Sequence, residues 1–129
     1  MPSDVWSLAV FRRAYAVSIE IHRASLQFPK IEQFSGIADQ LRRSSKSVCA
    51  LLAEGVGRQA GSEAEFRRYV VMALGSAEEC KLWCRYAQDL GHAEDQAATK
   101  WQTEYGEIAR MLVGLRKHLS DLPSLTTGD

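Results

Sequence analysis

Residues 62–91 read SEAEFRRYVVMALGSAEECKLWCRYAQDLG and carry the clearest helix signal in the chain. Ser62 and Glu65 match a capping box, in which the Ser62 hydroxyl accepts from the Glu65 amide and the Glu65 carboxylate reaches back to the Ser62 amide. Gly91 follows the last periodic residue and can adopt the left-handed conformation that ends a helix. The stretch therefore predicts a helix over about 62–90. Small or apolar residues recur along it every three or four positions: Phe66, Val70, Ala73, Ala77, Cys80, Cys84 and Ala87.

Three further helices are predicted along the rest of the chain. No stretch shows the sustained two-residue alternation that marks strands. The prolines at 2, 29 and 123 and the glycines at 55, 57 and 61 fall at candidate element ends. We expect helices over about 4–28, 35–57 and 93–121. The fold class is then all-α, an antiparallel up-down four-helix bundle in a single domain over 1–122, with a flexible C-terminal tail at 123–129.

The composition is that of one globular domain. The chain has 129 residues, of which 46% are hydrophobic and 25% charged. Sixteen Lys and Arg balance sixteen Asp and Glu, so the net charge gives no reason to expect nucleic acid or an anionic membrane as partner. The longest apolar run, residues 70–74, is too short to span a membrane, and no secretory signal is visible. Three cysteines fit a reducing compartment, so we expect a cytoplasmic protein.

The predicted helix over 4–28 carries more apolar surface than one bundle needs. Beside the row that faces the core, a second apolar set lies about 150° away around the helix. A helix of a monomeric bundle needs a stripe only a little over ~100° wide. The surplus predicts burial against another copy of the chain. The alternative is that this helix lies deep in the subunit and that the 35–57 helix or the tail covers the rest. The second set, our candidate oligomer interface, is Leu8, Phe11, Tyr15, Ile19 and Leu26.

Catalytic and metal-binding interpretations find little support. Residues 55–60 read GVGRQA and formally fit a dinucleotide fingerprint, but they follow a predicted helix rather than a strand. Cys80 and Cys84 lie one turn apart, yet a metal site needs two more ligands, and no histidine has a matching spacing. We expect both cysteines to be small buried core residues. We predict no catalytic residue, no cofactor and no metal.

Glu54 lies in the last turn of the predicted 35–57 helix, where the helix dipole disfavours a negative charge. We expect Arg58 or an arginine of another helix to compensate it. We interpret Glu54 as part of a hydrogen-bonded tie between helices rather than as a general acid or base. Its predicted role is therefore structural, like those of Ser62, Glu65 and Gly91.

One basic region is a candidate nucleic-acid surface. Repeated around an oligomer, it would present a collective positive field stronger than the neutral monomer suggests. The alternative is a solvated helix face, since the chain carries no recognised nucleic-acid motif. The candidate residues lie in the 35–57 helix and on both sides of the following turn: Arg42, Arg43, Lys46, Arg58, Arg67 and Arg68.

Two segments of the chain together resemble a known family. Residues 40–58 read QLRRSSKSVCALLAEGVGR, and residues 66–92 read FRRYVVMALGSAEECKLWCRYAQDLGH. They resemble the 23S rRNA intervening-sequence proteins, whose relatives include the accessory variability determinants of diversity-generating retroelements. The positions that match the family's pattern are Phe28, Pro29, Glu32, Gln40, Leu41, Arg42, Arg43, Ser47, Val48, Leu52, Ala53, Glu54, Gly55, Gly57, Arg58, Ala73, Gly75, Ser76, Glu79, Asp89, Leu90 and Gly91.

The resemblance implies an up-down four-helix bundle that assembles as a homopentameric ring and is not an enzyme. Some relatives bind nucleic acid and a reverse transcriptase through a basic ring surface. Two departures matter here: Leu51 stands where the family often has Asn, and the chain is neutral where the nucleic-acid-binding relatives are basic. We therefore expect a self-assembling scaffold or binding protein. The alternative is an accessory protein that binds structured RNA or DNA, with a protein such as a reverse transcriptase as a further partner.

Overall fold

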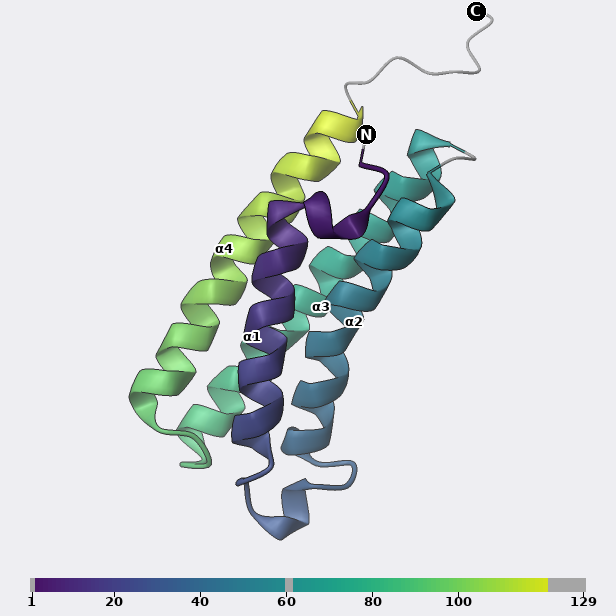
Figure 1. Cartoon of the computed structure of the whole chain (residues 1–129). Coiled ribbons are helices and arrows are strands. Elements are labelled where there is room, and N and C mark those ends of the chain that lie inside the picture. Colours follow the sequence, from purple (N-terminus) through teal and green to yellow (C-terminus); the bar gives the residue numbers. More distant parts are fainter. Residues whose placement is uncertain (1, 60–61, 121–129) are drawn as a thin grey trace, which may run out of the picture.

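A computed structural model describes residues 2–59 and 62–120 of the chain as an antiparallel bundle of four long helices. The helices run alternately up and down, so the N-terminus lies at the same end of the bundle as the end of the last helix (Figure 1). Within these residues every regular element is helical, which confirms the predicted all-α fold class. The elements are η1 (Val5–Ser7), α1 (Ala9–Ser25), η2 (Lys30–Glu32), α2 (Ile37–Arg58), α3 (Glu63–Asp89) and α4 (Asp95–Ser120).

The N-terminal segment differs from the single helix predicted over 4–28. The Asp4 carboxylate accepts a hydrogen bond from the Trp6 amide at 3.1 Å and caps the short 3-10 turn η1. The backbone is extended at Leu8, and α1 starts only at the next residue. This local cap explains why the periodic pattern alone placed the helix start too early. The predicted tail at 123–129 lies outside the described residues.

Both predicted ends of α3 are confirmed. The Ser62 hydroxyl accepts from the Glu65 amide at 2.9 Å, which is one half of the predicted capping box. The Glu65 carboxylate instead accepts from Arg68 Nε at 2.9 Å, and no bond to it from the Ser62 amide is seen in the described part of the chain. Gly91 has φ +74°, the left-handed conformation expected after the helix end. The His92 amide then donates to the Ala87 carbonyl at 2.8 Å, as in a Schellman-type cap.

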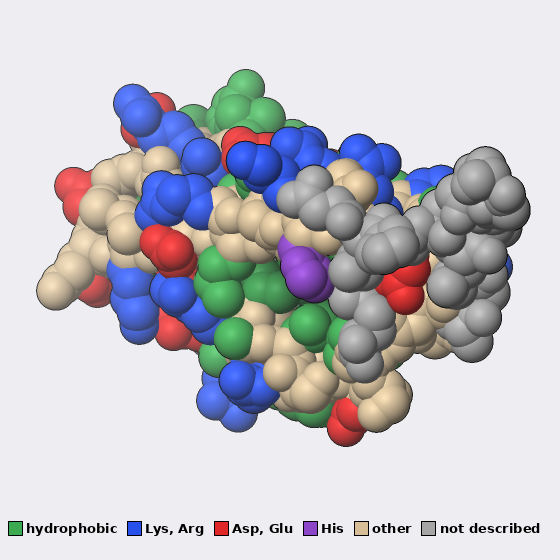
Figure 2. All heavy atoms as spheres, turned by 90° about the horizontal axis from the view of Figure 1, so that it is seen from above, with side chains coloured by type: hydrophobic (Ala, Val, Ile, Leu, Met, Phe, Trp, Pro, Cys, Tyr) green, Lys and Arg blue, Asp and Glu red, His purple; other side chains and the backbone are tan. Residues whose placement is uncertain are grey.

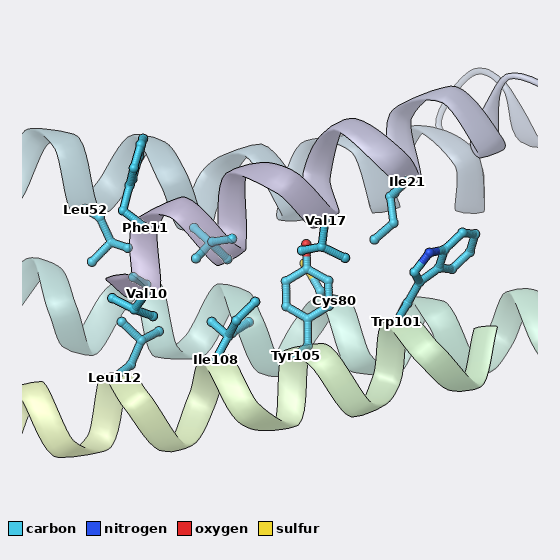
Figure 3. Packing of buried hydrophobic residues seen from close by; sticks show 14 of the residues in the cluster. Val10, Phe11, Val17, Ile21, Leu52, Cys80, Trp101, Tyr105, Ile108 and Leu112 are labelled. Carbon is cyan, nitrogen blue, oxygen red and sulfur yellow. The ribbon is translucent and has the colours of Figure 1, made fainter. Parts of the chain in front are cut away.

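The core is built around α3. Its predicted seam is wholly buried, from Phe66 to Ala87. Because most seam residues are alanines and cysteines, larger side chains of the other helices fill the space over them. Tyr105 of α4 reaches across the core toward Cys80, with Ile108 and Trp101 packed along the same helix (Figure 3).

Contacts between small residues and hydrogen bonds fix α2 against α3. A Cβ at Gly55 would lie 2.8 Å from the Cβ of Tyr69 and 3.1 Å from a Phe66 ring carbon, so only glycine permits this approach. The hydroxyls of Ser47 and Ser76 lie 3.0 Å apart. These contacts fix the register of α2 against α3, with Ser47 opposite Ser76 and Gly55 against Phe66 and Tyr69.

The packing of α1 is more one-sided, because it lies closer to α2 than to α4. Ion pairs bridge the α1–α4 side: Arg13 Nη2 lies 2.7 Å from Glu104, and Lys100 Nζ lies 3.1 Å from Glu20. Trp101 Nε1 also donates to Glu20 at 3.1 Å. Burial opposes ionisation of Glu20, but the hydrogen bonds from Lys100 and Trp101 leave its pKa below the ordinary value.

Glu32 joins the two loops at the far end of the bundle. Its carboxylate accepts from the Ile37 amide at 2.9 Å and so caps α2, and its other oxygen lies 2.8 Å from His92 Nε2 in the α3–α4 turn. The Ile37 amide, followed by His92, lowers the pKa of Glu32 below its ordinary value. One carboxylate thus holds the α1–α2 loop, the start of α2 and the α3–α4 turn together.

We expect Gly55→Ala to lower the free energy of unfolding by about 1–3 kcal/mol, because the added methyl group forces α2 away from Tyr69. Gly114→Ala is the matched control, since a Cβ there meets nothing within 4 Å; it should stabilise the protein by about 0.5–1 kcal/mol through helix propensity. Denaturant unfolding at one fixed protein concentration measures both. Equal effects of the two changes would contradict the close α2–α3 contact.

We expect Glu32→Gln to lower the free energy of unfolding by about 1 kcal/mol near neutral pH. Because the folded-state pKa of Glu32 is below 4.5, the carboxylate contributes its full stability above that pH, and the contribution is lost as the pH falls through the folded value. The difference between wild type and variant should therefore shrink between about pH 6 and about pH 3. A difference independent of pH would show that the carboxylate charge does not matter.

Candidate interaction surfaces

An apolar groove of about 400 Å³ lies between α1 and α2 on the surface of the bundle. Its open side is the face of α1 that was predicted to carry surplus apolar residues. Most of its lining is carbon, with one lysine and one histidine at its edge. We call it the α1–α2 groove, and it is lined by Tyr15, Ser18, Ile19, His22, Lys46 and Cys49.

The five predicted interface residues of α1 have different environments. Tyr15 and Leu26 are exposed, at 42% and 54%, and Ile19 is half-buried in the wall of the groove. Leu8 is half-buried and packs against the core. The apolar surplus on α1 is therefore real but smaller than the sequence indicated.

Phe11 corrects the prediction, because it is only 5% exposed and belongs to the core of its own subunit. The turn η1 folds back and places the Trp6 ring edge-on to Phe11, with ring centroids 4.8 Å apart. Trp6 also meets the Tyr15 ring at 4.9 Å and is itself 48% exposed. Trp6 thus replaces Phe11 in the exposed apolar face, a role that the sequence reasoning did not assign to it.

Positive charge surrounds the groove. Lys46 Nζ lies 3.0 Å from His22 Nδ1. Partial burial, together with the charges of Lys46 and Arg42, lowers the pKa of His22, so the neutral ring can accept this hydrogen bond. Among the described residues, Lys46, Arg12 and Arg23 form no salt bridge with a carboxylate. Lys46 thus lines the groove without a carboxylate partner, and the same lack holds for Arg12 and Arg23 of α1, although Arg12 donates to the Trp6 carbonyl at 2.7 Å.

Arg42, a predicted nucleic-acid contact, has an internal role. Its guanidinium donates to the Ser25 hydroxyl at 2.8 Å and to the Gln33 side-chain and backbone oxygens at 3.1 and 3.2 Å. These hydrogen bonds join α2 to the end of α1 and to the loop after it. These three bonds give Arg42 a structural role within the subunit beside the nucleic-acid contact that was predicted for it.

The structure does not bring the six predicted basic residues together. Arg43 and Lys46 lie in the first half of α2, whereas Arg58 is its last residue, fifteen residues after Arg43 and roughly 22 Å farther along the helix. Arg67 and Arg68 lie with Arg58 at the α2–α3 end. Seen from above, Lys and Arg side chains gather around this end, with acidic side chains between them (Figure 2).

Glu54 has the compensated environment that was predicted. Arg58 Nη2 lies 3.1 Å from the Glu54 carboxylate, one turn along α2. The Tyr69 hydroxyl of α3 donates to the same carboxylate at 2.9 Å. The Arg58 guanidinium also lies over the Tyr69 ring, 5.5 Å from its centroid. Glu54 therefore connects two helices next to Gly55, as the predicted hydrogen-bonded tie requires.

A second apolar surface, which the sequence analysis missed, runs along the outer side of α3. Large apolar side chains there fall within about a 100° arc, roughly 160° around the helix from the buried seam. Their four-residue spacing from residue 82 to residue 90 is visible in the sequence. It was missed because the buried row of α3 already accounts for the helical periodicity of this segment. We call this surface the α3 stripe: Val71, Met72, Leu82, Tyr86 and Leu90, all exposed, with the open Gly75 between them.

Cys80 and Cys84 are core residues, as predicted, whereas Cys49 is half-buried and lines the α1–α2 groove. Cys80 and Cys84 are fully buried, and Cys80 Sγ donates to the Ser44 hydroxyl at 3.3 Å. Burial raises the pKa of Cys49 and of Cys80 to about 11, so both thiols are protonated and unreactive near neutral pH. No cluster of three or more metal-ligating side chains occurs in residues 2–59 and 62–120. In the same part of the chain, none of the helices is both long and apolar enough to cross a membrane.

The comparisons with known proteins agree with this fold. The sequence pattern described as 23S rRNA-intervening sequence protein matches residues 7–114. A crystal structure of a protein of unknown function from the S23 ribosomal protein family of Bacteroides thetaiotaomicron superposes with a TM-score of 0.75 at 20% identity, over 84% of this chain and 99% of that one. No curated protein matches the chain. Because the family pattern covers most of its length, the chain belongs to the 23S rRNA-intervening sequence protein family.

Proposed function

We propose that this protein is a non-enzymatic, cytoplasmic scaffold whose biochemical activity is self-assembly into a ring, as the resemblance to pentameric relatives implies. The observation that carries this proposal is the presence of two large apolar surfaces, the α1–α2 groove with its neighbours and the α3 stripe, on one subunit. Solvent-exposed apolar surface of this extent is a mark of protein interfaces. The three protonated thiols accord with a reducing compartment.

The exposed surfaces are suited to packing rather than to chemistry. Tyr15, Ile19 and Leu82 offer ring and aliphatic carbon, and the one thiol in the groove, Cys49, has its pKa raised by burial. A nucleophile needs a lowered pKa or an adjacent base to act near neutral pH. This environment supports the non-enzymatic part of the proposal.

We expect sedimentation equilibrium of the purified chain to give a pentamer of about 72 kDa, five times the 14.4 kDa of one chain. The measurement should be repeated over a wide range of protein concentration and of salt, because an apolar interface is stabilised rather than weakened by salt. A monomer at every concentration would remove the assembly proposal. A closed oligomer of another size would support self-assembly but contradict the pentameric stoichiometry.

A second candidate function is binding of structured RNA or DNA at the α2–α3 end of the assembly, with a reverse transcriptase as a further partner. The specific observation is that Arg67, Arg116 and Lys117 form no salt bridge within the described residues. Arg67 donates to Ser120 at 2.6 Å, which places it beside the last turn of α4. Five copies of this end in a ring would form one basic surface.

If this candidate is right, the assembled protein should shift a structured RNA in a gel at low salt, and affinity should fall steeply as salt rises. Arg67→Glu with Lys117→Glu should weaken binding and reduce the salt slope by about one unit for each phosphate that the variant no longer binds. Arg110→Glu is the control, since Arg110 is an equally exposed residue of α4 that pairs with Glu107. Absence of binding at low salt, or equal weakening by both variants, would end the nucleic-acid candidate.

A further inference from the structure

The two apolar surfaces lie on different sides of the subunit. The helices α1 and α3 are the diagonal pair of the bundle, since each packs against α2 and α4. In Figure 1, α1 lies in front and α3 behind. The α1–α2 groove therefore faces one side of the bundle, and the α3 stripe points away from the opposite corner. One type of interface, repeated between copies, can cover both surfaces of every subunit only if the groove of one copy meets the stripe of another.

The two surfaces differ in shape. Between α1 and α2 the surface is hollow, with a volume of about 400 Å³, and the exposed residues of α2 that follow Lys46 and Cys49 include the small Ala50 and Ala53. The α3 stripe projects, because Leu82 and Tyr86 are 51% and 47% exposed. A hollow between two helices with small residues at its border accepts the ridge of a third helix.

The charges of the two surfaces are also complementary. Lys46, which lines the groove, has no carboxylate partner among the described residues, and the same holds for Arg12 and Arg23 on α1. Glu79 lies within the α3 stripe and, in the same part of the chain, accepts only from Trp83 Nε1, at 3.0 Å, with no cation beside it. Each surface thus carries the charge that the other lacks.

The heights of these groups along the bundle agree. The Cys80–Ser44 and Ser47–Ser76 hydrogen bonds fix the α2–α3 register, which sets Glu79 level with Lys46. The same register sets Leu82 level with Arg42. Because Arg42 binds Ser25, Leu82 is also near the height of Leu26, the exposed residue next to Ser25 on α1. A rotation about an axis parallel to the bundle keeps every residue at its own height. In such a ring, Glu79 of one copy comes opposite Lys46 of the next.

We propose that the α3 stripe of one subunit packs into the α1–α2 groove of the next subunit, in a head-to-tail interface repeated around the ring. This proposal rests on the proposed function, self-assembly, and specifies its interface. An interface between two unlike surfaces forms a ring when the rotation between neighbours closes, whereas a surface that meets its own copy gives dimers. The shape, the charge and the height of the groups all favour pairing of unlike surfaces over pairing of like ones.

The test uses one variant of each surface. Ile19→Glu places a charge in the groove and leaves the stripe intact, and Leu82→Glu does the reverse. Alone, each variant should sediment as a monomer, because it lacks one half of every interface. Mixed in equal amounts, the two variants should form a 1:1 heterodimer of about 28.8 kDa, twice the chain mass, and nothing larger. Ile31→Glu, at a position 85% exposed in η2 and outside both surfaces, should assemble as the wild type does.

Other outcomes are equally informative. If each variant alone stays dimeric, like surfaces pair with each other and the head-to-tail interface is wrong. If the mixture stays monomeric although the wild type assembles, the proposed pairing is wrong and assembly stands. A monomeric wild type would overturn assembly itself. Circular dichroism checks that each variant is folded, and Tyr15→Glu with Tyr86→Glu repeats the experiment at other positions if either first variant is not.

A charge exchange tests the pairing of Glu79 with Lys46. Glu79→Lys alone should weaken assembly, since it places a cation against the basic rim of the neighbouring groove. Combining Glu79→Lys with Lys46→Glu in one chain should restore assembly at least in part. Equal weakening by the double and single variants would contradict the predicted position of Glu79 opposite Lys46.

Discussion

Small side chains on the buried side of α3 determine how the rest of the molecule is built. Ala73, Ala77 and Ala87 let α2 and α4 approach closely, and Gly55 permits the same approach from the α2 side. Several large apolar residues of α3, among them Leu82 and Tyr86, lie on its outer side. The helix is thus apolar on two opposite sides. In a monomer the outer apolar side stays in contact with water and contributes no hydrophobic stabilisation. In an assembly the same side can be buried, which is favourable.

Much of the fold could be predicted from the sequence, because periodicity and caps are local signals. The four long helices, the Ser62 cap and the left-handed Gly91 were all predicted correctly. The errors arose where a distant or competing contact decides. Trp6 covers Phe11 because Asp4 caps the start of a short turn, and Arg42 donates a hydrogen bond to Ser25 of another helix. Neither contact can be derived from spacing within one helix.

The candidate surfaces were predictable only in part, for a related reason. The surplus on α1 stood out because that helix shows two apolar rows in sequence, and Tyr15 and Leu26 are indeed exposed. The stripe on α3 was missed, because the buried row of that helix, mostly alanines and cysteines, already accounts for its periodicity. The larger apolar residues on its outer side were therefore not recognised as a second row. The six basic residues look contiguous along the sequence, yet the structure divides them between the middle of α2 and the α2–α3 end.

The central claim is that copies of this chain cover both apolar surfaces at once. Hydroxyl-radical footprinting of the assembled wild-type protein, followed by mass spectrometry of its peptides, tests it most directly. Side chains on both surfaces, including Tyr15 and Tyr86, should be protected, while Phe34, 86% exposed and outside both surfaces, should be oxidised freely. Dilution below the assembly concentration should expose both tyrosines together. Oxidation of Tyr15 and Tyr86 at the rate of Phe34 in the concentrated protein would contradict the account.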